Sequence, residues 1–93
     1  MKYDVRATTK FRKNYKKMQK RGLRREDFEV VLDKLKNGRR LSFRNHDHAL
    51  TGEYIGFREC HINPDWLLIY KIEDDILILT LIDTGSYADL FDM

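Results

Sequence analysis

The first third of the chain places apolar residues at the spacing of an α-helix, between positively charged ones. Thr8 or Thr9 can cap this helix, and its narrow apolar face consists of Phe11, Tyr15 and Met18. A second helix is predicted over residues 24–36, and its apolar face consists of Leu23, Phe28, Val31, Leu32 and Leu35. Together with a short strand predicted at residues 2–6, this pattern indicates a helical hairpin that follows one strand.

After residue 40 the apolar period changes from helical to strand-like. Residues 41–50 are expected to form a loop that ends on buried Ala49 and Leu50. Strands are predicted over residues 53–62, 66–72 and 76–82, separated by the turn sequences NPD and EDD. The last two strands are apolar on both faces, which predicts a central position in the sheet with the helices covering one side.

The predicted order of elements is β-α-α-β-β-β, with an extra strand if EYIGFRECHI breaks at Gly56. This is an α+β fold in which an N-terminal helical hairpin packs on a small antiparallel sheet. A chain of 93 residues is expected to form a single domain over residues 1–93. Its apolar runs are too short to span a bilayer, no signal-peptide pattern is visible, and a single cysteine fits a reducing cytoplasm. We therefore expect a cytoplasmic protein with no membrane partner.

The charge of the chain is divided unevenly between its halves. Residues 1–44 contain 16 Lys or Arg and 5 Asp or Glu, whereas residues 45–93 contain 2 and 10, giving balances of +11 and −8. Such a split favours a nucleic-acid partner, and a solvated helix face is the alternative. The basic residues expected to contact RNA are Lys10, Arg12, Lys13, Lys16, Lys17 and Lys20.

Three histidines form the candidate chemistry of the acidic half. His46 and His48 form an H-x-H pair, and His61 lies four residues before Asp65, across the predicted turn. A zinc site would need a spacing that this sequence lacks, so we expect neither a metal nor another cofactor. Acid–base catalysis is the second interpretation, in which the Asp65 carboxylate orients the His61 ring and raises its pKa. A turn held by these two residues with no catalytic role is the third.

Three aromatic residues are candidates for contacts with a nucleotide. Trp66 begins a predicted strand, where it serves either as core or as a platform for an unpaired base. Tyr87 and Phe91 lie four residues apart on a predicted final helical turn that Ser86 can cap. Together with the histidines, these residues suit metal-independent RNA cleavage, in which the ribose 2′-OH attacks the adjacent phosphate.

Residues 47–91 resemble the YafQ branch of the RelE/ParE toxin superfamily. The resemblance is carried by DHALTG, by RECHINPDWLLIY and by TGSYADLF, which follow the family pattern closely except at one position. It implies a RelE-like fold and a ribosome-dependent mRNA endonuclease, the toxin of a type II toxin–antitoxin pair that cuts the codon in the ribosomal A site. It also implies a cognate antitoxin that covers the basic surface and blocks the site.

The resemblance assigns roles to individual residues of this sequence. Those that match family residues implicated in catalysis or substrate binding are His48, His61, Asp65, Trp66 and Phe91. Arg58 is a phosphate contact by position, because its bidentate fork suits a phosphate group. The basic residues of the first helix would meet ribosomal RNA in a salt-sensitive interaction.

The departure from the family pattern is Tyr87, which stands where the family usually has histidine. A phenol holds its proton at neutral pH and is a poor base, so we expect attenuated activity. A natural variant and an inactivating substitution both explain the tyrosine. Two other functions stay open: a non-enzymatic ParE-like toxin that inhibits gyrase, and an RNA-binding module that needs only its basic helices.

Overall fold

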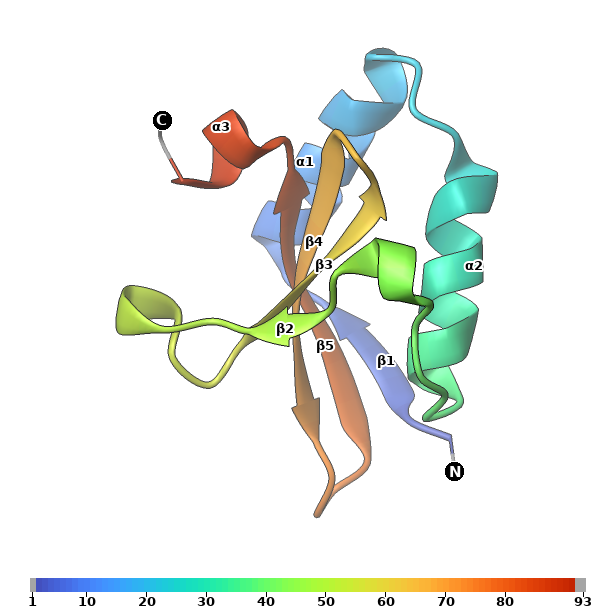
Figure 1. The fold of residues 1–93 in the computed structure, drawn as a ribbon, viewed down its shortest axis with the longest axis vertical. Helices are drawn as coiled ribbons and strands as arrows, with labels where there is room; N and C mark the ends of the chain where they lie inside the picture. The colour runs from blue at the N-terminus through green and yellow to red at the C-terminus, as the bar shows by residue number, and fades with distance from the viewer. Residues whose placement is uncertain (1, 92–93) are drawn as a thin grey trace.

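The computed structural model describes residues 2–91 and builds them into one mixed five-stranded sheet with two long helices on one face (Figure 1). The strands are β1 (Asp4–Ala7), β2 (His48–Ala49), β3 (Arg58–Asn63), β4 (Trp66–Glu73) and β5 (Ile78–Gly85). The α-helices are α1 (Thr9–Lys20), α2 (Arg25–Lys36) and the short α3 (Tyr87–Phe91). Two 3-10 turns, η1 (Phe43–Asn45) and η2 (Gly52–Tyr54), flank β2. The predicted α+β fold is confirmed. An additional strand is present, but it is β2 in the segment 41–50 that was predicted as a loop, and not a product of a break at Gly56.

The strands lie side by side in the order β1-β5-β4-β3-β2. Strands β2 to β5 pair antiparallel, as predicted. Strand β1 differs, because it pairs parallel with β5 and makes the sheet mixed rather than antiparallel. A parallel pair needs a long crossover, which the helical hairpin and the intervening strands supply. The alternation within a strand is the same for either direction, so the sequence pattern could not distinguish the two.

Both long helices form in the segments for which the apolar spacing predicts them. Thr8 caps α1, since its side chain accepts a hydrogen bond from the backbone N–H of Phe11 at 2.9 Å. Past the C-terminus of α1, Gly22 has a φ of 90°, a conformation that residues with a Cβ rarely adopt. Helix α1 buries Phe11 and Met18 against the sheet, and α2 buries residues at three positions of its apolar face: Phe28, Val31 and Leu35.

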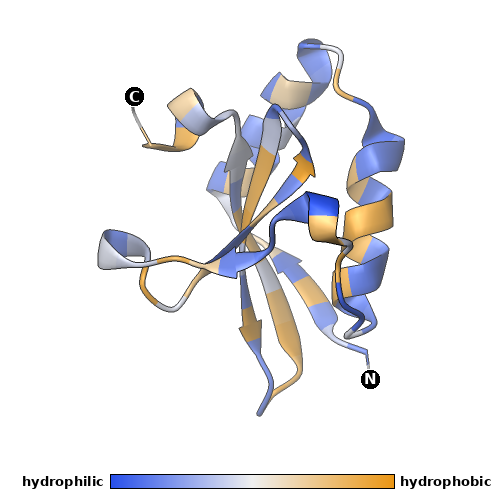
Figure 2. Cartoon of the chain, in the orientation of Figure 1, coloured by the Kyte–Doolittle hydropathy of each residue, from blue (hydrophilic) through white to orange (hydrophobic). Residues whose placement is uncertain are grey.

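The sheet is covered on both faces, in agreement with the apolar character of β4 and β5 (Figure 2). On the helix side, α1 and α2 pack on side chains that include Cys60, Trp66, Leu68 and Tyr70. The opposite face, here called the open face, carries a smaller cluster of buried residues: Leu67, Ile69 and Leu90. Leu90 comes from α3, so the C-terminal helix covers part of the open face.

Residues 41–50 are more ordered than the predicted loop. They contain η1 and β2, and His48 of β2 pairs with Glu59 of β3. Ala49 is exposed rather than buried, because β2 lies at the edge of the sheet. The predicted strand 53–62 is shorter than expected, since η2 takes its first residues and Gly56 turns the chain with a φ of 94°. No helix within residues 2–91 is long and apolar enough to cross a membrane.

Candidate active site

Three imidazoles gather where η1 and β2 meet β3. The backbone of His46 is left-handed, with a φ of 47°, and its ring centroid lies 5.3 Å from that of His61. His48 follows two residues later, and its Nδ1 donates a hydrogen bond to the backbone carbonyl of His46 at 2.7 Å. A carbonyl can only accept, so this bond fixes a proton on Nδ1 and leaves Nε2 available to exchange protons.

A buried carboxylate faces this available nitrogen. The Oε1 atom of Glu59 lies 3.6 Å from Nε2 of His48, and the other oxygen has no hydrogen-bond partner among residues 2–91. Burial raises the pKa of Glu59, and the nearby charge of His48 opposes that shift. Glu59 was not among the predicted site residues, although an acidic side chain between buried strand positions was a signal that could have marked it.

His61 shares the open face with Glu59, because the two are separated by one residue on β3. Burial lowers the pKa of His61, and the neighbouring His46 and His48 lower it further. The prediction that Asp65 raises this pKa is wrong. Asp65 is exposed in the β3–β4 turn, where its backbone N–H bonds to the Asn63 side chain at 2.9 Å. The imidazole of His61 therefore favours its neutral form at pH 7.

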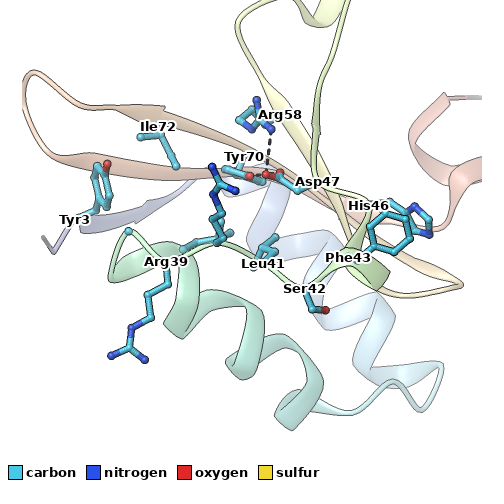
Figure 3. A pocket seen from close by; sticks show the side chains of 13 residues that line it. Tyr3, Arg39, Leu41, Ser42, Phe43, His46, Asp47, Arg58, Tyr70 and Ile72 are labelled. Atoms are coloured by element: carbon cyan, nitrogen blue, oxygen red, sulfur yellow. Dashed lines mark hydrogen bonds and ion pairs between the residues drawn. The ribbon is translucent and has the colours of Figure 1, made fainter.

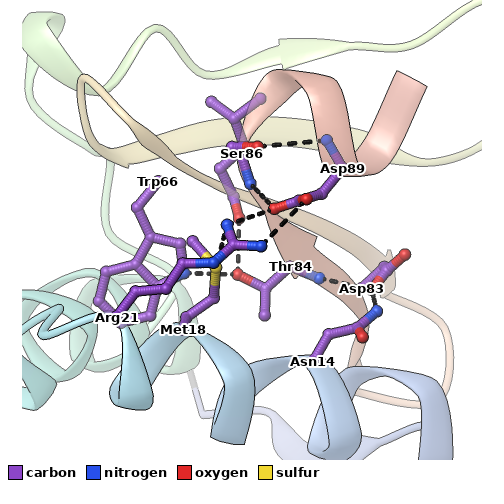
Figure 4. Close-up of polar contacts among 9 residues, drawn as sticks. Asn14, Met18, Arg21, Trp66, Asp83, Thr84, Ser86 and Asp89 are labelled. Atoms are coloured by element: carbon purple, nitrogen blue, oxygen red, sulfur yellow. Dashed lines mark hydrogen bonds and ion pairs between the residues drawn. The ribbon is translucent and has the colours of Figure 1, made fainter. Parts of the chain in front are cut away.

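Trp66 was predicted as a stacking platform, and the structure contradicts this. Its side chain is 0% exposed and packs on the helix side against Tyr15 and Phe28. The indole N–H donates to the Thr84 hydroxyl at 2.7 Å, and that hydroxyl donates to the carbonyl of Leu67 (Figure 4). Trp66 is therefore a core residue whose polar atom is satisfied internally.

Arg58 was expected to contact a phosphate, but its guanidinium is engaged within the protein. It pairs with the carboxylate of Asp47 at 3.0 Å, and the hydroxyl of Tyr70 donates to the same carboxylate (Figure 3). These residues lie at the wall of a cavity of about 460 Å³. Asp47 immediately precedes His48, so the pairing anchors the segment that carries the imidazoles to the sheet.

Helix α3 carries Tyr87 and Phe91 and is held against α1. Ser86 and Asp89 cap its first turn reciprocally, with bonds of 2.9 and 3.2 Å between the side chain of each and the backbone N–H of the other. Arg21, just past α1, donates two hydrogen bonds to Asp89, at 2.7 and 3.2 Å (Figure 4). A Cβ at Gly85 would lie 2.9 Å from that of Asp89, so glycine permits this close approach.

The two predicted aromatic residues of α3 lie together on the open face. The ring centroids of Tyr87 and Phe91 are 4.9 Å apart, and the ring centroid of Phe91 lies 5.8 Å from that of Tyr54 in η2. Tyr87 is exposed, whereas Phe91 is partly buried. In the sheet, Leu67 of β4 lies between His61 of β3 and Gly85 of β5. Strand β4 therefore separates the start of α3 from the strand that carries His61.

The basic residues of α1 lie on the other side of the sheet from the imidazoles. A shallow depression is bordered by Thr9 and by five predicted RNA contacts: Arg12, Lys13, Lys16, Lys17 and Lys20. Lys10 lies apart from them, with its amino group 3.4 Å from the carboxylate of Asp83. Helix α1 packs its apolar face on the sheet, so these charges point toward solvent.

No group of three or more His, Cys, Asp or Glu side chains within residues 2–91 is arranged to hold a metal ion. The zinc site considered from the sequence, three imidazoles with Asp65, is therefore not assembled in this part of the chain.

Comparisons with known proteins identify the family of this chain. The sequence profile of the family described as "Bacterial toxin of type II toxin-antitoxin system, YafQ" matches residues 3–92. The chain belongs to the YafQ toxin family. A relative from Escherichia coli (strain B / BL21-DE3), named mRNA interferase toxin YafQ, is 34% identical over 89 residues, which cover 95% of each chain. The predicted family is thus confirmed.

Solved YafQ structures match the fold over nearly the whole chain. The crystal structure of YafQ from E. coli strain BL21(DE3) superposes with a TM-score of 0.89 at 33% identity, covering 96% of this chain and 98% of that one. The E. coli DinJ-YafQ toxin-antitoxin complex matches with a TM-score of 0.88 at 33% identity, covering 98% and 99%. The predicted RelE-like fold is confirmed by these neighbours.

Proposed function

We propose that this chain is an mRNA interferase, the toxin of a type II toxin–antitoxin pair, and that it cuts mRNA in the ribosomal A site. One observation carries the proposal: three imidazoles and a desolvated carboxylate share one edge of the open face in a YafQ family member. The relative that aligns over 95% of both chains is named an mRNA interferase, which supports RNA cleavage over gyrase inhibition.

The imidazoles divide the proton transfers. His61, with its lowered pKa, is neutral at pH 7 and accepts the proton of the ribose 2′-OH. The 2′-oxygen then bonds to phosphorus, and the bond from phosphorus to the 5′-oxygen breaks. His48 donates an Nε2 proton to that leaving oxygen, and the carboxylate of Glu59 lies 3.6 Å from that nitrogen. The products are a 2′,3′-cyclic phosphate and a 5′-hydroxyl.

The remaining predicted residues act around this centre. Asp65 is exposed at the adjacent turn and orients the substrate or accepts a proton. Phe91 holds a nucleotide on the open face, and Arg58, paired with Asp47, holds the segment that carries His48. Tyr87 occupies the position of a family histidine and keeps its proton at neutral pH, so cleavage by this chain is slow.

The two faces of the sheet meet different partners. The basic surface of α1 contacts ribosomal RNA, because dense lysine and arginine side chains bind phosphates without sequence preference. The imidazoles on the opposite side face the mRNA codon. An acidic antitoxin regulates the chain, which the complex of a YafQ relative with DinJ supports.

The test uses programmed ribosomes and primer extension of the mRNA 5′ ends. We expect weak A-site cleavage by this chain, at least tenfold stronger cleavage by Tyr87→His, and none by His61→Ala in either background. Asp75→Asn, in the distant β4–β5 turn, is the control and leaves cleavage unchanged. Equal cleavage with and without His61, or no cleavage by the Tyr87→His form, would overturn the proposal.

A further inference from the structure

Because Trp66 lies in the core, it cannot stack on a base next to the imidazoles. Phe43 of η1 is 94% exposed, a high value for a large apolar side chain. A single exposed apolar residue is common and by itself indicates nothing. Its surroundings are what single it out.

The ring of Phe43 leads directly to the imidazoles. Its centroid lies 6.1 Å from that of His46, which in turn lies 5.3 Å from that of His61. Figure 3 shows Phe43 and His46 side by side at one end of the cavity. The three rings form a continuous row from solvent to the imidazole that we propose as the base.

The segment that presents Phe43 is held in place. The Ser42 hydroxyl donates to the side-chain oxygen of Asn45 at 2.9 Å, and the amide of buried Asn45 donates to the carbonyl of His61 at 2.7 Å. The phenyl ring is thus exposed to solvent, while the η1 turn that carries it is hydrogen-bonded to β3. A rigid, exposed ring loses little conformational freedom when a ligand stacks on it.

The same segment is positively charged. Arg39, Arg40 and Arg44 flank Phe43, and none of them forms an ion pair within residues 2–91. Arg39 and Arg40 also line the cavity of about 460 Å³. A basic surface with an exposed aromatic ring is the combination that binds single-stranded nucleic acid, because bases stack on the ring while arginines meet the phosphates.

We propose that Phe43 is the stacking platform for an mRNA base next to the cleaved bond, and that Arg39, Arg40 and Arg44 contact the adjoining phosphates. The inference deepens the proposed function and rests on it. Continuity of the ring row with His61 favours RNA over an acidic protein segment, which needs the arginines but not a phenyl ring beside an imidazole.

The experiment measures binding of a fluorescein-labelled 2′-O-methyl RNA decamer by anisotropy. This RNA cannot be cut, so the binding result is independent of whether the chain cleaves. We expect Phe43→Ala to raise the Kd by about 5- to 150-fold, the range for one stacked base, and Phe43→Trp to preserve binding. Ile55→Ala, at a residue that is 78% exposed on the η2 side, is the matched control and leaves the Kd unchanged.

A second readout addresses the arginines. Arg44→Gln should reduce the slope of log Kd against log salt by about 0.7, the value for one phosphate contact on a single strand. The proposal is overturned if the parent chain does not bind the decamer, or if Phe43→Ala binds as tightly as the parent. It is also overturned if Phe43→Ala weakens only the binding of the antitoxin, which would assign this surface to a protein partner.

Discussion

Asp89 links the position of α3 to the end of α1, and its removal tests how the C-terminal part of the site is held. In Asp89→Ala the helix loses the reciprocal cap with Ser86 and both hydrogen bonds from Arg21. The α3 helix has only five residues, and Leu90 is its buried contact with the sheet. A helix this short depends on its cap and its packing for stability.

The size of the effect follows from the geometry. Loss of a capping side chain costs about 1 kcal/mol in typical helices. The side chains of Arg21 and Asp89 are 50% and 37% exposed, so solvent screens the ion pair and it contributes the smaller share. We expect Asp89→Ala to lower the free energy of unfolding by about 1–2 kcal/mol, or about 4–16 °C in Tm for a domain of this size.

The pH dependence of the stability difference shows whether the ionised carboxylate of Asp89 stabilises the fold. Arg21, and next the backbone N–H of Ser86, hold the pKa of Asp89 well below its ordinary value of 3.8. A depressed pKa contributes stability above the ordinary value and loses it as pH falls toward the folded-state value. The difference in Tm between parent and Asp89→Ala should therefore be constant from pH 5 to 8 and shrink below about pH 4.

Thermal unfolding followed by circular dichroism measures these differences, and amide exchange over residues 87–91 locates them. Asp89→Asn keeps an acceptor for the Ser86 N–H and should lose less than half as much stability as Asp89→Ala. Lys20→Ala, in the last turn of α1 next to Arg21, is the control. A Tm of Asp89→Ala within about 2 °C of the parent, or a difference that grows in acid, would refute the reasoning.

The remaining predictions concern the imidazoles and the buried carboxylate. Because the pKa of His61 lies below its ordinary value of 6.5, cleavage by the Tyr87→His form should rise with pH in the acid range and should not rise further from pH 7 to 8; a continued rise through pH 8, measured by primer extension, would exclude neutral His61 as the base. Glu59 has a raised pKa, so its contribution to stability is lost as pH increases through the folded-state value. Glu59→Gln removes the buried charge and should accordingly raise stability at pH 7 in urea unfolding, while cleavage falls at least tenfold; unchanged cleavage would separate Glu59 from the proposed chemistry.

Much of this fold could be predicted because most of its helices and strands have a clear local pattern of apolar residues. The apolar faces of α1 and α2 have strict helical spacing, and the predicted second helix, 24–36, differs from α2 by one residue. The direction of β1 could not be predicted, since parallel and antiparallel strands share the same alternation. Ala49 was misplaced because burial at a sheet edge depends on neighbours that no local pattern reveals.

The site was predicted less completely, for a related reason. His48 and His61 were identified by residue type, and the structure brings them to one edge through the pairing of β2 with β3. Trp66 was misassigned because β4 is apolar on both faces, and only the packing of α1 and α2 decides which side chains they cover. Phe43 lies in a segment without periodicity, so its exposure and its row of rings exist only in three dimensions.

The parallel pairing of β1 with β5 also determines when the fold can form. The Thr8 hydroxyl bonds to the carbonyl of Ile82, 74 positions later, and Asn14 of α1 bonds to Asp83, 69 positions later. Contacts so distant in sequence form late and slow the folding reaction. In a nascent chain whose β5 has not yet emerged from the ribosome, β1 therefore has no strand to pair with, and α1 has no strand to pack on. Because β5 continues directly into α3, completion of the core and arrival of the C-terminal site residues are a single event during synthesis. A truncated product that ends before β5 would therefore lack both the completed sheet and the aromatic residues of α3.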